Sequence, residues 1–230
     1  MKKVLCLLLV VLMFSCIPAM AAGKLEISQE TFYVMPYYSD NYAGYVYAEV
    51  ENVGDKPVVF NGGLLELFNA DGDSIEANDY VSCYPSVLNP GEKGYIYVSQ
   101  DVEEATTPDY IDDYLLTVTG KGENEATVHR FPATGEYRVV EDYWTEYYLF
   151  GEVENDTDQI CYNVELVYVV KDATGKLLYC ESDTLYEVGI MPGMKIATYT
   201  ELSSSLIEFL EENALSIDQV EVIAYMIQEA

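Results

Sequence analysis

The sequence has few basic residues, and this scarcity limits its partners. Lysine and arginine number 11 against 40 acidic residues, which gives a formal net charge of −29. A surface that binds DNA, RNA or an anionic membrane needs clustered Lys and Arg side chains to neutralise phosphate. The charge balance therefore excludes nucleic acid and anionic membrane surfaces as partners, although it selects no particular partner among the rest.

Histidine is nearly absent as well, which removes most metal and nucleophile chemistry. His129 is the single histidine and no Cys-x-x-Cys pair occurs, so the sequence lacks a zinc site. Hydrolysis would need a nucleophile with a base, or paired carboxylates in a cleft. Among 40 acidic residues some pair of carboxylates always occurs, so a pair in the sequence does not by itself identify an active site. We predict a protein that is not an enzyme and needs no cofactor.

The first 21 residues have the features of a signal peptide. Lys2-Lys3 precedes an apolar run from Val4 to Phe14, which is shorter than the ~20 residues that a membrane-spanning helix needs. Ala19 and Ala21 suit the −3 and −1 positions of a signal-peptidase site. We expect secretion with cleavage near Ala21. An alternative is a lipoprotein anchored at Cys16.

Three cysteines follow this segment, namely Cys83, Cys161 and Cys180. An odd number permits at most one bridge within the chain, although extracellular proteins usually pair their cysteines. The spacing matches no disulfide framework, so buried free thiols are slightly favoured over a Cys161–Cys180 bridge.

An internal repeat is the strongest feature of the sequence. Glu49-Val50-Glu51-Asn52 recurs unchanged as Glu152-Val153-Glu154-Asn155. Further landmarks recur in the same order: Asn69-Ala70-Asp71-Gly72 with Asp172-Ala173-Thr174-Gly175, Leu88-Asn89-Pro90-Gly91 with Ile190-Met191-Pro192-Gly193, and Ile111-Asp112 with Ile217-Asp218. A period of about 100 residues indicates duplicated domains, because solenoid units have about 20–50 residues. We expect a signal peptide at 1–21, one domain at 22–132 and a second at 133–230.

Each repeat has the pattern of an all-β domain. Val46, Ala48 and Val50 alternate with more polar neighbours, which places the aliphatic side chains on one face of a strand. The glutamates expected on the outward, solvated face are Glu49, Glu51, Glu152 and Glu154. Short strands separated by turns indicate antiparallel β-sandwiches. The predicted fold class is all-β, with two tandem immunoglobulin-like sandwich domains.

Two segments depart from the repeat. Ser205 to Asn213 is predicted to be a short helix inserted in the second domain, since Ser205 and Glu208 have the spacing of a capping box. Ala126 to Phe131 is predicted to add a strand to the first domain, with the domain boundary near residues 132–135.

Several landmarks also match a known pattern. Ala48-Glu49-Val50-Glu51-Asn52 and Gly151-Glu152-Val153-Glu154-Asn155 have the form small-x-Val-x-Asn, and Leu88-Asn89-Pro90-Gly91-Glu92 forms a Leu-x-Pro-Gly-Glu turn. In these elements the repeats resemble the FxLYD-type immunoglobulin-like domains of secreted and lipoprotein-anchored bacterial proteins. Leu65-Glu66-Leu67-Phe68-Asn69 stands at the place of the name-giving motif and keeps its central leucine. The resemblance implies an immunoglobulin-like fold and no catalytic residues.

Aromatic residues provide the candidate ligand site. Ten of the 22 tyrosines and the single tryptophan gather at the start of the repeats, as Tyr33, Tyr37, Tyr38, Tyr42, Tyr45 and Tyr47, and as Tyr137, Tyr143, Trp144, Tyr147 and Tyr148. Exposed Tyr and Trp side chains can stack on sugar rings or anchor a protein interface. Tyr143, Trp144 and Tyr147 are the predicted ligand-binding residues. The alternative is that these side chains cover a sheet face or an interface between domains.

Asn69, Asp71 and Asp73 form a candidate metal site, because their alternate spacing resembles the start of a calcium loop. The matching segment of the second repeat, residues 171–175, keeps the glycine and loses the alternate oxygen ligands. The comparison favours a hairpin turn.

Together these features predict a secreted, non-enzymatic protein of two immunoglobulin-like repeats that binds a protein or glycan at the cell surface. Two alternatives stay open. A structural spacer without its own ligand would have neither a pocket nor an aromatic patch. A carboxylate-based hydrolase would have a cleft with two close carboxylates, at least one of them with a raised pKa.

Overall fold

The computed structural model describes residues 23–37, 41–122 and 127–228. The predicted signal peptide and Cys16 lie outside these ranges. The strands are β1 (Leu25–Pro36), β2 (Tyr42–Asn52), β3 (Val58–Phe68), β4 (Ser74–Asn78), β5 (Cys83–Tyr84), β6 (Val87–Leu88), β7 (Lys93–Val102), β8 (Asp113–Gly122), β9 (Thr127–Phe131), β10 (Ala133–Glu141), β11 (Thr145–Glu154), β12 (Val164–Lys171), β13 (Leu177–Leu185), β14 (Lys195–Leu202) and β15 (Gln219–Gln228). The helical elements are the 3-10 turn η1 (Pro108–Tyr110) and the α-helix α2 (Ser204–Glu212). Within the described ranges, no helix is long and apolar enough to cross a membrane.

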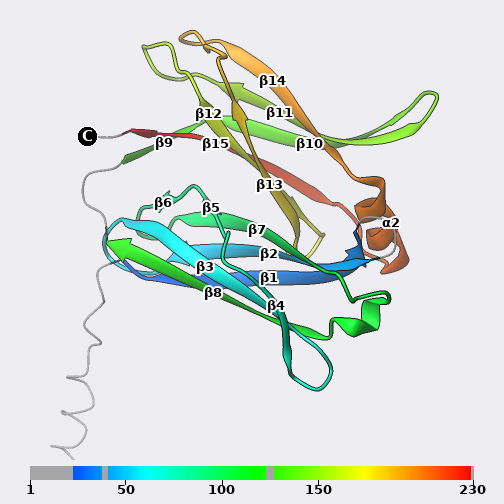
Figure 1. Ribbon diagram of the computed structural model, residues 1–230. Coiled ribbons are helices and arrows are strands. Elements are labelled where there is room, and N and C mark those ends of the chain that lie inside the picture. The colour runs from blue at the N-terminus through cyan, green and yellow to red at the C-terminus, as the bar shows by residue number, and fades with distance from the viewer. Residues whose placement is uncertain (1–22, 38–40, 123–126, 229–230) are drawn as a thin grey trace, which may run out of the picture.

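In the described part of the chain, the strands pair into four antiparallel sheets, so the predicted all-β class is confirmed. We number the sheets by their order in the stack of Figure 1, from the bottom upward. Sheet I contains β4, β3 and β6, with β8 also paired to β3; sheet II is β1-β2-β7-β5; sheet III is β13-β12-β15-β9; sheet IV is β10-β11-β14. We call β1 to β8 the first unit and β9 to β15 the second unit.

The core of the first unit lies between sheets I and II. Val46, Ala48 and Val50 of β2 are fully buried there, as their alternation predicts, and they belong to one apolar cluster with Leu65 and Leu67 of β3. Because successive side chains of a strand point to opposite faces, the residues between them, such as Tyr47 and Glu49, face away from this core.

Sheet III is buried on both faces, between sheets II and IV. Val164 to Val170 of β12 form an almost continuous apolar run, which is typical of a strand covered on both sides. The core cluster of the second unit also contains Tyr33, Tyr47 and Tyr95 from sheet II. The two units therefore share the second of these cores, in which sheet III covers the face of sheet II that does not contact sheet I.

Two buried asparagines occupy matching positions in the two units. Asn52 donates its side-chain N–H groups to the carbonyl oxygens of Lys56 and Leu88, and Asn155 donates in the same way to Gln159 and Ile190. Buried polar side chains are costly unless they are hydrogen-bonded, and both amides are satisfied here. The Asn of the repeated Glu-Val-Glu-Asn element thus connects the end of its strand to two neighbouring segments by hydrogen bonds.

The predicted additional strand belongs to a different sheet than expected. β9 pairs with β15 of sheet III, with Phe131 opposite Ala224, rather than joining the first unit. Phe131 is 5% exposed and packs in the second core, which gives this pairing its physical basis. Of residues 132–135, predicted as a boundary, only Pro132 lies between β9 and β10, and the other three belong to β10.

The predicted helix is present, with a different cap. α2 is capped by Ser203, whose side chain accepts a hydrogen bond from the Leu206 N–H at 3.2 Å. Ser205 already lies inside the helix, whereas a capping residue must have extended backbone, as Ser203 does with φ −64° and ψ 140°.

Candidate binding surfaces

The junction between the units is held by a buried ion cluster around Glu49. Its side chain is 0% exposed, so the expectation of a solvated position was wrong, because sheet III covers this face of β2. Lys93 Nζ lies 2.7 Å from Glu49 Oε1, and Lys171 Nζ of the second unit lies 3.0 Å from Oε2. Ser28 Oγ and Tyr95 Oη also donate to this carboxylate.

These donors keep Glu49 ionised. Burial alone would raise the pKa of the Glu49 carboxyl, but hydrogen bonds from Lys93, Lys171 and Ser28 lower it to about 2. A buried charge is tolerated when it is paired and hydrogen-bonded, as this one is. The cluster therefore fixes β12 of the second unit against β2 of the first.

Sheet IV leaves the corresponding face open. Glu152 is the repeat counterpart of Glu49, and its side chain is 49% exposed; Lys195 Nζ lies 2.7 Å from Glu152 Oε1 at the surface. Glu154 is 41% exposed, so the outward position expected for these two glutamates is confirmed. No other described segment covers this face, which lies at the top of the stack in Figure 1.

Aromatic side chains gather on this open surface. The rings of Tyr148 and Phe150 lie 5.5 and 5.9 Å from the ring of Tyr199, which is 62% exposed. Arg138 stacks over Phe150 at 4.7 Å from the ring centroid. A hollow of about 520 Å³ beside Phe150 is lined in part by Arg138 and Glu136. We call Arg138, Tyr148, Phe150, Glu152 and Tyr199 the sheet IV face.

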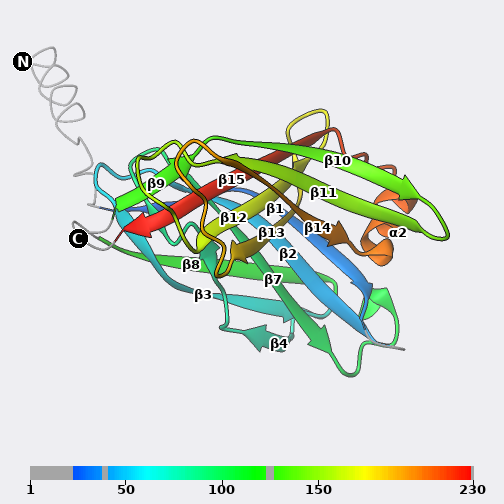
Figure 2. The ribbon, with the colours of Figure 1, turned by 90° about the horizontal axis from the view of Figure 1, so that it is seen from above.

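The predicted ligand residues divide between two environments. Tyr143 and Trp144 are 90% and 79% exposed, in the turn between β10 and β11, which projects beyond the stack in Figures 1 and 2. Tyr147 is half-buried and packs against the second core. The structure thus brings Tyr143 and Trp144 together at a hairpin tip and turns Tyr147 inward.

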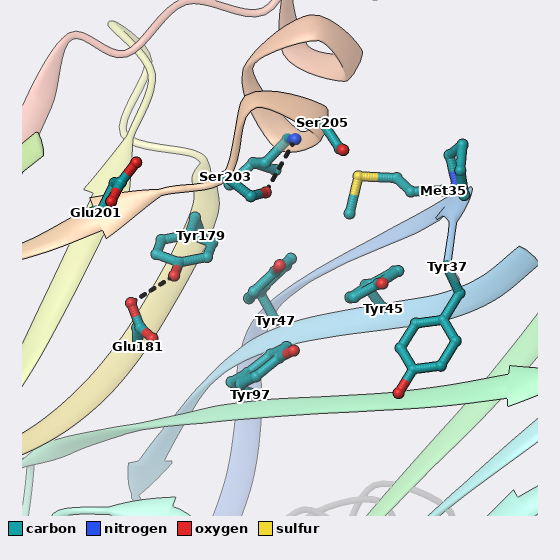
Figure 3. A pocket seen from close by; sticks show the side chains of 12 residues that line it. Met35, Tyr37, Tyr45, Tyr47, Tyr97, Tyr179, Glu181, Glu201, Ser203 and Ser205 are labelled. Atoms are coloured by element: carbon teal, nitrogen blue, oxygen red, sulfur yellow. Dashed lines mark hydrogen bonds between the residues drawn. The ribbon is translucent and has the colours of Figure 1, made fainter. Parts of the chain in front are cut away.

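A second candidate site is a pocket of about 380 Å³ where sheets II, III and IV meet helix α2. We call it the junction pocket (Figure 3). Its lining residues are Met35, Pro36, Tyr37, Tyr45, Tyr47, Tyr97, Tyr179, Glu181, Glu201, Ser203, Ser205 and Leu206. Sequence reasoning missed this pocket, because its side chains come from strands far apart in the chain.

Tyrosine rings form one wall of the junction pocket. Tyr47 and Tyr97 stack with centroids 5.4 Å apart and an angle of 13° between the rings, and Tyr179 lies 5.1 Å from Tyr47. The Tyr179 hydroxyl donates to Glu181 Oε2 at 2.7 Å, which Figure 3 shows. Burial raises the pKa of Tyr47 well above its ordinary value, and burial together with Glu181 does the same for Tyr179. The pocket therefore presents neutral phenols beside carboxylates.

The candidate calcium loop forms a turn between β3 and β4. Asn69 Oδ1 accepts hydrogen bonds from the backbone N–H groups of Asp71 at 3.1 Å and Asp73 at 2.9 Å. Asp172 makes the matching bonds to Thr174 and Lys176 in the second unit. Within the described ranges, no group of three or more His, Cys, Asp or Glu residues is placed to hold a metal ion.

The three cysteines of the described ranges are buried and free, namely Cys83, Cys161 and Cys180. The preference for buried thiols over a Cys161–Cys180 bridge is confirmed. His129, the single histidine, lies at the surface with Nε2 2.9 Å from Asp156 Oδ1.

No family model matches the chain, and no curated protein matches it. Among solved structures, it is similar to Bacteroides uniformis β-glucuronidase 2. A calcium-binding mutant of that enzyme is 14% identical with a TM-score of 0.21, over 75% of this chain and 23% of that chain. The enzyme covalently bound to cyclophellitol-6-carboxylate aziridine is 13% identical, also with a TM-score of 0.21, over 79% of this chain and 28% of that chain. The chain thus spans about a quarter of the length of these structures, and similarity at this level carries no conclusion about function.

Proposed function

We propose that this chain is a secreted, non-enzymatic protein of two immunoglobulin-like units that binds a protein at the cell surface. The binding surface is the sheet IV face together with Tyr143 and Trp144 at the adjoining hairpin tip. The second unit presents this surface, and the first unit is docked beneath it.

One observation carries this proposal. The face of sheet II around Glu49 is a protein interface, covered by sheet III, whereas the face around its counterpart Glu152 is open. The open face keeps the aromatic and charged composition of the buried one, with Tyr199 in place of Tyr97 and Lys195 in place of Lys93. A face of this kind is suited to binding a protein partner, because aromatic residues and arginine dominate the energetics of protein interfaces.

The non-enzymatic part of the proposal is supported by electrostatics. A carboxyl that acts as a general acid near neutral pH needs a raised pKa. Glu49 has the opposite shift, and hydrogen bonds from Thr174 and Lys176 likewise lower the pKa of Asp172. A spacer without a ligand would need neither the exposed hairpin aromatics nor the junction pocket.

A glycan is the second candidate for the same surface. The hollow beside Phe150 joins an aromatic ring to Arg138 and Glu136, and sugars bind through ring stacking and hydrogen bonds to such side chains. A surface protein would instead cover the whole face together with the hairpin tip.

Calorimetry tests this proposal, because it measures binding without a fluorescent probe and therefore also in variants that lack Trp144. The secreted chain is titrated with surface proteins and with glycans from the cells that produce it. We expect a surface protein to bind. Trp144→Ala and Tyr199→Ala should each weaken its binding about tenfold or more, the effect of removing an interface anchor.

Tyr80→Ala is the matched control, because Tyr80 is 90% exposed in the first unit. It should bind as the unchanged chain does. A partner that binds Trp144→Ala and Tyr199→Ala with full affinity would contradict the proposal. Binding of a glycan alone would support the second candidate.

A further inference from the structure

We propose that the junction pocket binds a small quaternary ammonium ion. This site is distinct from the sheet IV face, and the inference does not depend on the function proposed for that face. It rests on three properties of the pocket: its aromatic side chains, its carboxylates that form no ion pair, and the lack of basic side chains in its lining.

Aromatic faces attract cations because the ring quadrupole is negative above the ring plane. Tyr97 stacks on the buried ring of Tyr47 from the neighbouring strand of sheet II, and Tyr179 approaches Tyr47 from β13. Tyr97 is 42% exposed, so its ring is accessible from the pocket. In Figure 3 the rings of Tyr45 and Tyr37 lie beside those of Tyr47 and Tyr97.

Two carboxylates also line the same pocket. Figure 3 shows Glu181 beside Tyr179, whose hydroxyl donates to it, and Glu201 farther from the tyrosine rings. Within the described ranges, neither forms an ion pair, and no Lys, Arg or His lines the pocket. Two carboxylates and a chain charge of −29 favour a cation over a neutral or anionic ligand.

The helix terminus at the pocket opposes this preference only weakly. The N-terminus of α2 carries about half a positive charge, against a full negative charge on each of two carboxylates. Ser203 also lines the pocket, and its side chain accepts from the Leu206 N–H, so one of the free helix donors is already occupied.

The cation that fits is one whose charged group has no N–H donors and that carries no phosphate. A quaternary ammonium group interacts with ring faces through its charge, and the neutral phenols offer such faces. A phosphocholine group would bring its phosphate against Glu181 and Glu201. We therefore infer a free ammonium ligand, for which choline is the probe.

Calorimetric titration of the full secreted chain tests this assignment. The probes are choline, phosphocholine and the uncharged isostere of choline in which carbon replaces nitrogen. We expect choline to bind at least about tenfold more tightly than either of the others, since only choline combines the ring attraction with an unopposed positive charge.

Variants locate the binding in the pocket. Tyr97→Leu removes a ring face and should weaken choline binding about fivefold or more, whereas Tyr97→Phe keeps the face and should change it by less than about twofold. Glu181→Gln should also weaken it. Tyr199→Leu is the matched control, because Tyr199 is an exposed tyrosine outside the pocket, and it should leave choline binding unchanged.

Three results would overturn the assignment: no saturable choline binding, equal binding of choline and its isostere, or full binding by a folded Tyr97→Leu variant. Trp144→Ala separates the two proposals. Choline should bind that variant with unchanged affinity, while the surface partner of the sheet IV face should bind it about tenfold or more weakly.

Discussion

Lys171 of β12 reaches the fully buried carboxylate of Glu49 in β2, with Nζ 3.0 Å from Oε2. The two residues come from different units, and their charges meet where sheets II and III pack together. Lys93 pairs with the same carboxylate from within the first unit. The ion cluster therefore contributes to the docking of the units as well as to the stability of each.

Removing one cation from this cluster should destabilise the chain. We expect Lys171→Met to lower the free energy of unfolding by about 2–3 kcal/mol, because breaking a buried pair leaves a charge poorly compensated. Lys195→Met is the control: its pair with Glu152 is about half exposed, and such pairs contribute less than about 1 kcal/mol. Urea unfolding of both variants measures the difference. Equal losses would show that Lys171 contributes no more than a surface lysine.

The Glu49 cluster should also make stability depend on pH in the acid range. The pKa of Glu49 is about 2 in the folded chain against an ordinary 4.5, so the unfolded chain takes up this proton first as pH falls. The contribution is complete above about pH 4.5, is lost progressively toward pH 2, and is on the order of 3 kcal/mol.

Comparison with Glu49→Gln isolates this effect from the other acidic residues. The difference in unfolding free energy between the unchanged chain and Glu49→Gln should shrink as pH falls from about 5 to about 2. Glu152→Gln, at the exposed counterpart, should show little pH-dependent difference. A Glu49→Gln difference that stays constant over this range would contradict the assigned role.

The buried thiols should be unreactive in the folded chain. Burial raises the pKa of Cys83 to about 12 and also raises that of Cys180, so little thiolate forms at mildly alkaline pH. We expect slow labelling of Cys83, Cys161 and Cys180 by a disulfide reagent, and rapid labelling in concentrated guanidinium. Fast labelling without denaturant would mean that the core opens readily.

The Asn69 turn should not respond to calcium. An amide oxygen has two lone pairs, and the N–H groups of Asp71 and Asp73 use both at Asn69. We expect the melting temperature to be unchanged by millimolar Ca²⁺ in the unchanged chain and in Asp73→Asn. If Ca²⁺ raised the melting temperature of the unchanged chain but not that of Asp73→Asn, the result would support the metal site.

Local patterns predicted individual strands. The alternation at Val46, Ala48 and Val50 predicted the strand that corresponds to β2, and the strand predicted at Ala126 to Phe131 corresponds to β9. The sequence analysis missed β1 because apolar residues occupy both faces of this strand. Phe32 and Val34 face the first core, while Tyr33 and Met35 face the second. A strand buried on both sides in part of its length has no clear period of two.

The candidate sites depended on contacts that no local pattern contains. The alternation correctly placed Glu49 and Val50 on opposite faces of β2. Which of the two faces contacts solvent depends on the segments that pack against the strand. Sheet III covers Glu49 and leaves Glu152 open, although the two residues share an identical local sequence. The junction pocket is hidden from sequence reasoning for the same reason, since Tyr97 and Glu181 meet only after the units dock.

The shared core has a consequence for how the chain unfolds. Duplicated domains joined by a linker melt independently, each with its own transition. Here Tyr33, Met35, Tyr47 and Tyr95 of the first unit belong to the core of the second, so neither unit can lose its packing without exposing apolar surface of the other. We therefore expect the two units to unfold in a single cooperative transition, so that a destabilising substitution in either unit lowers the stability of both.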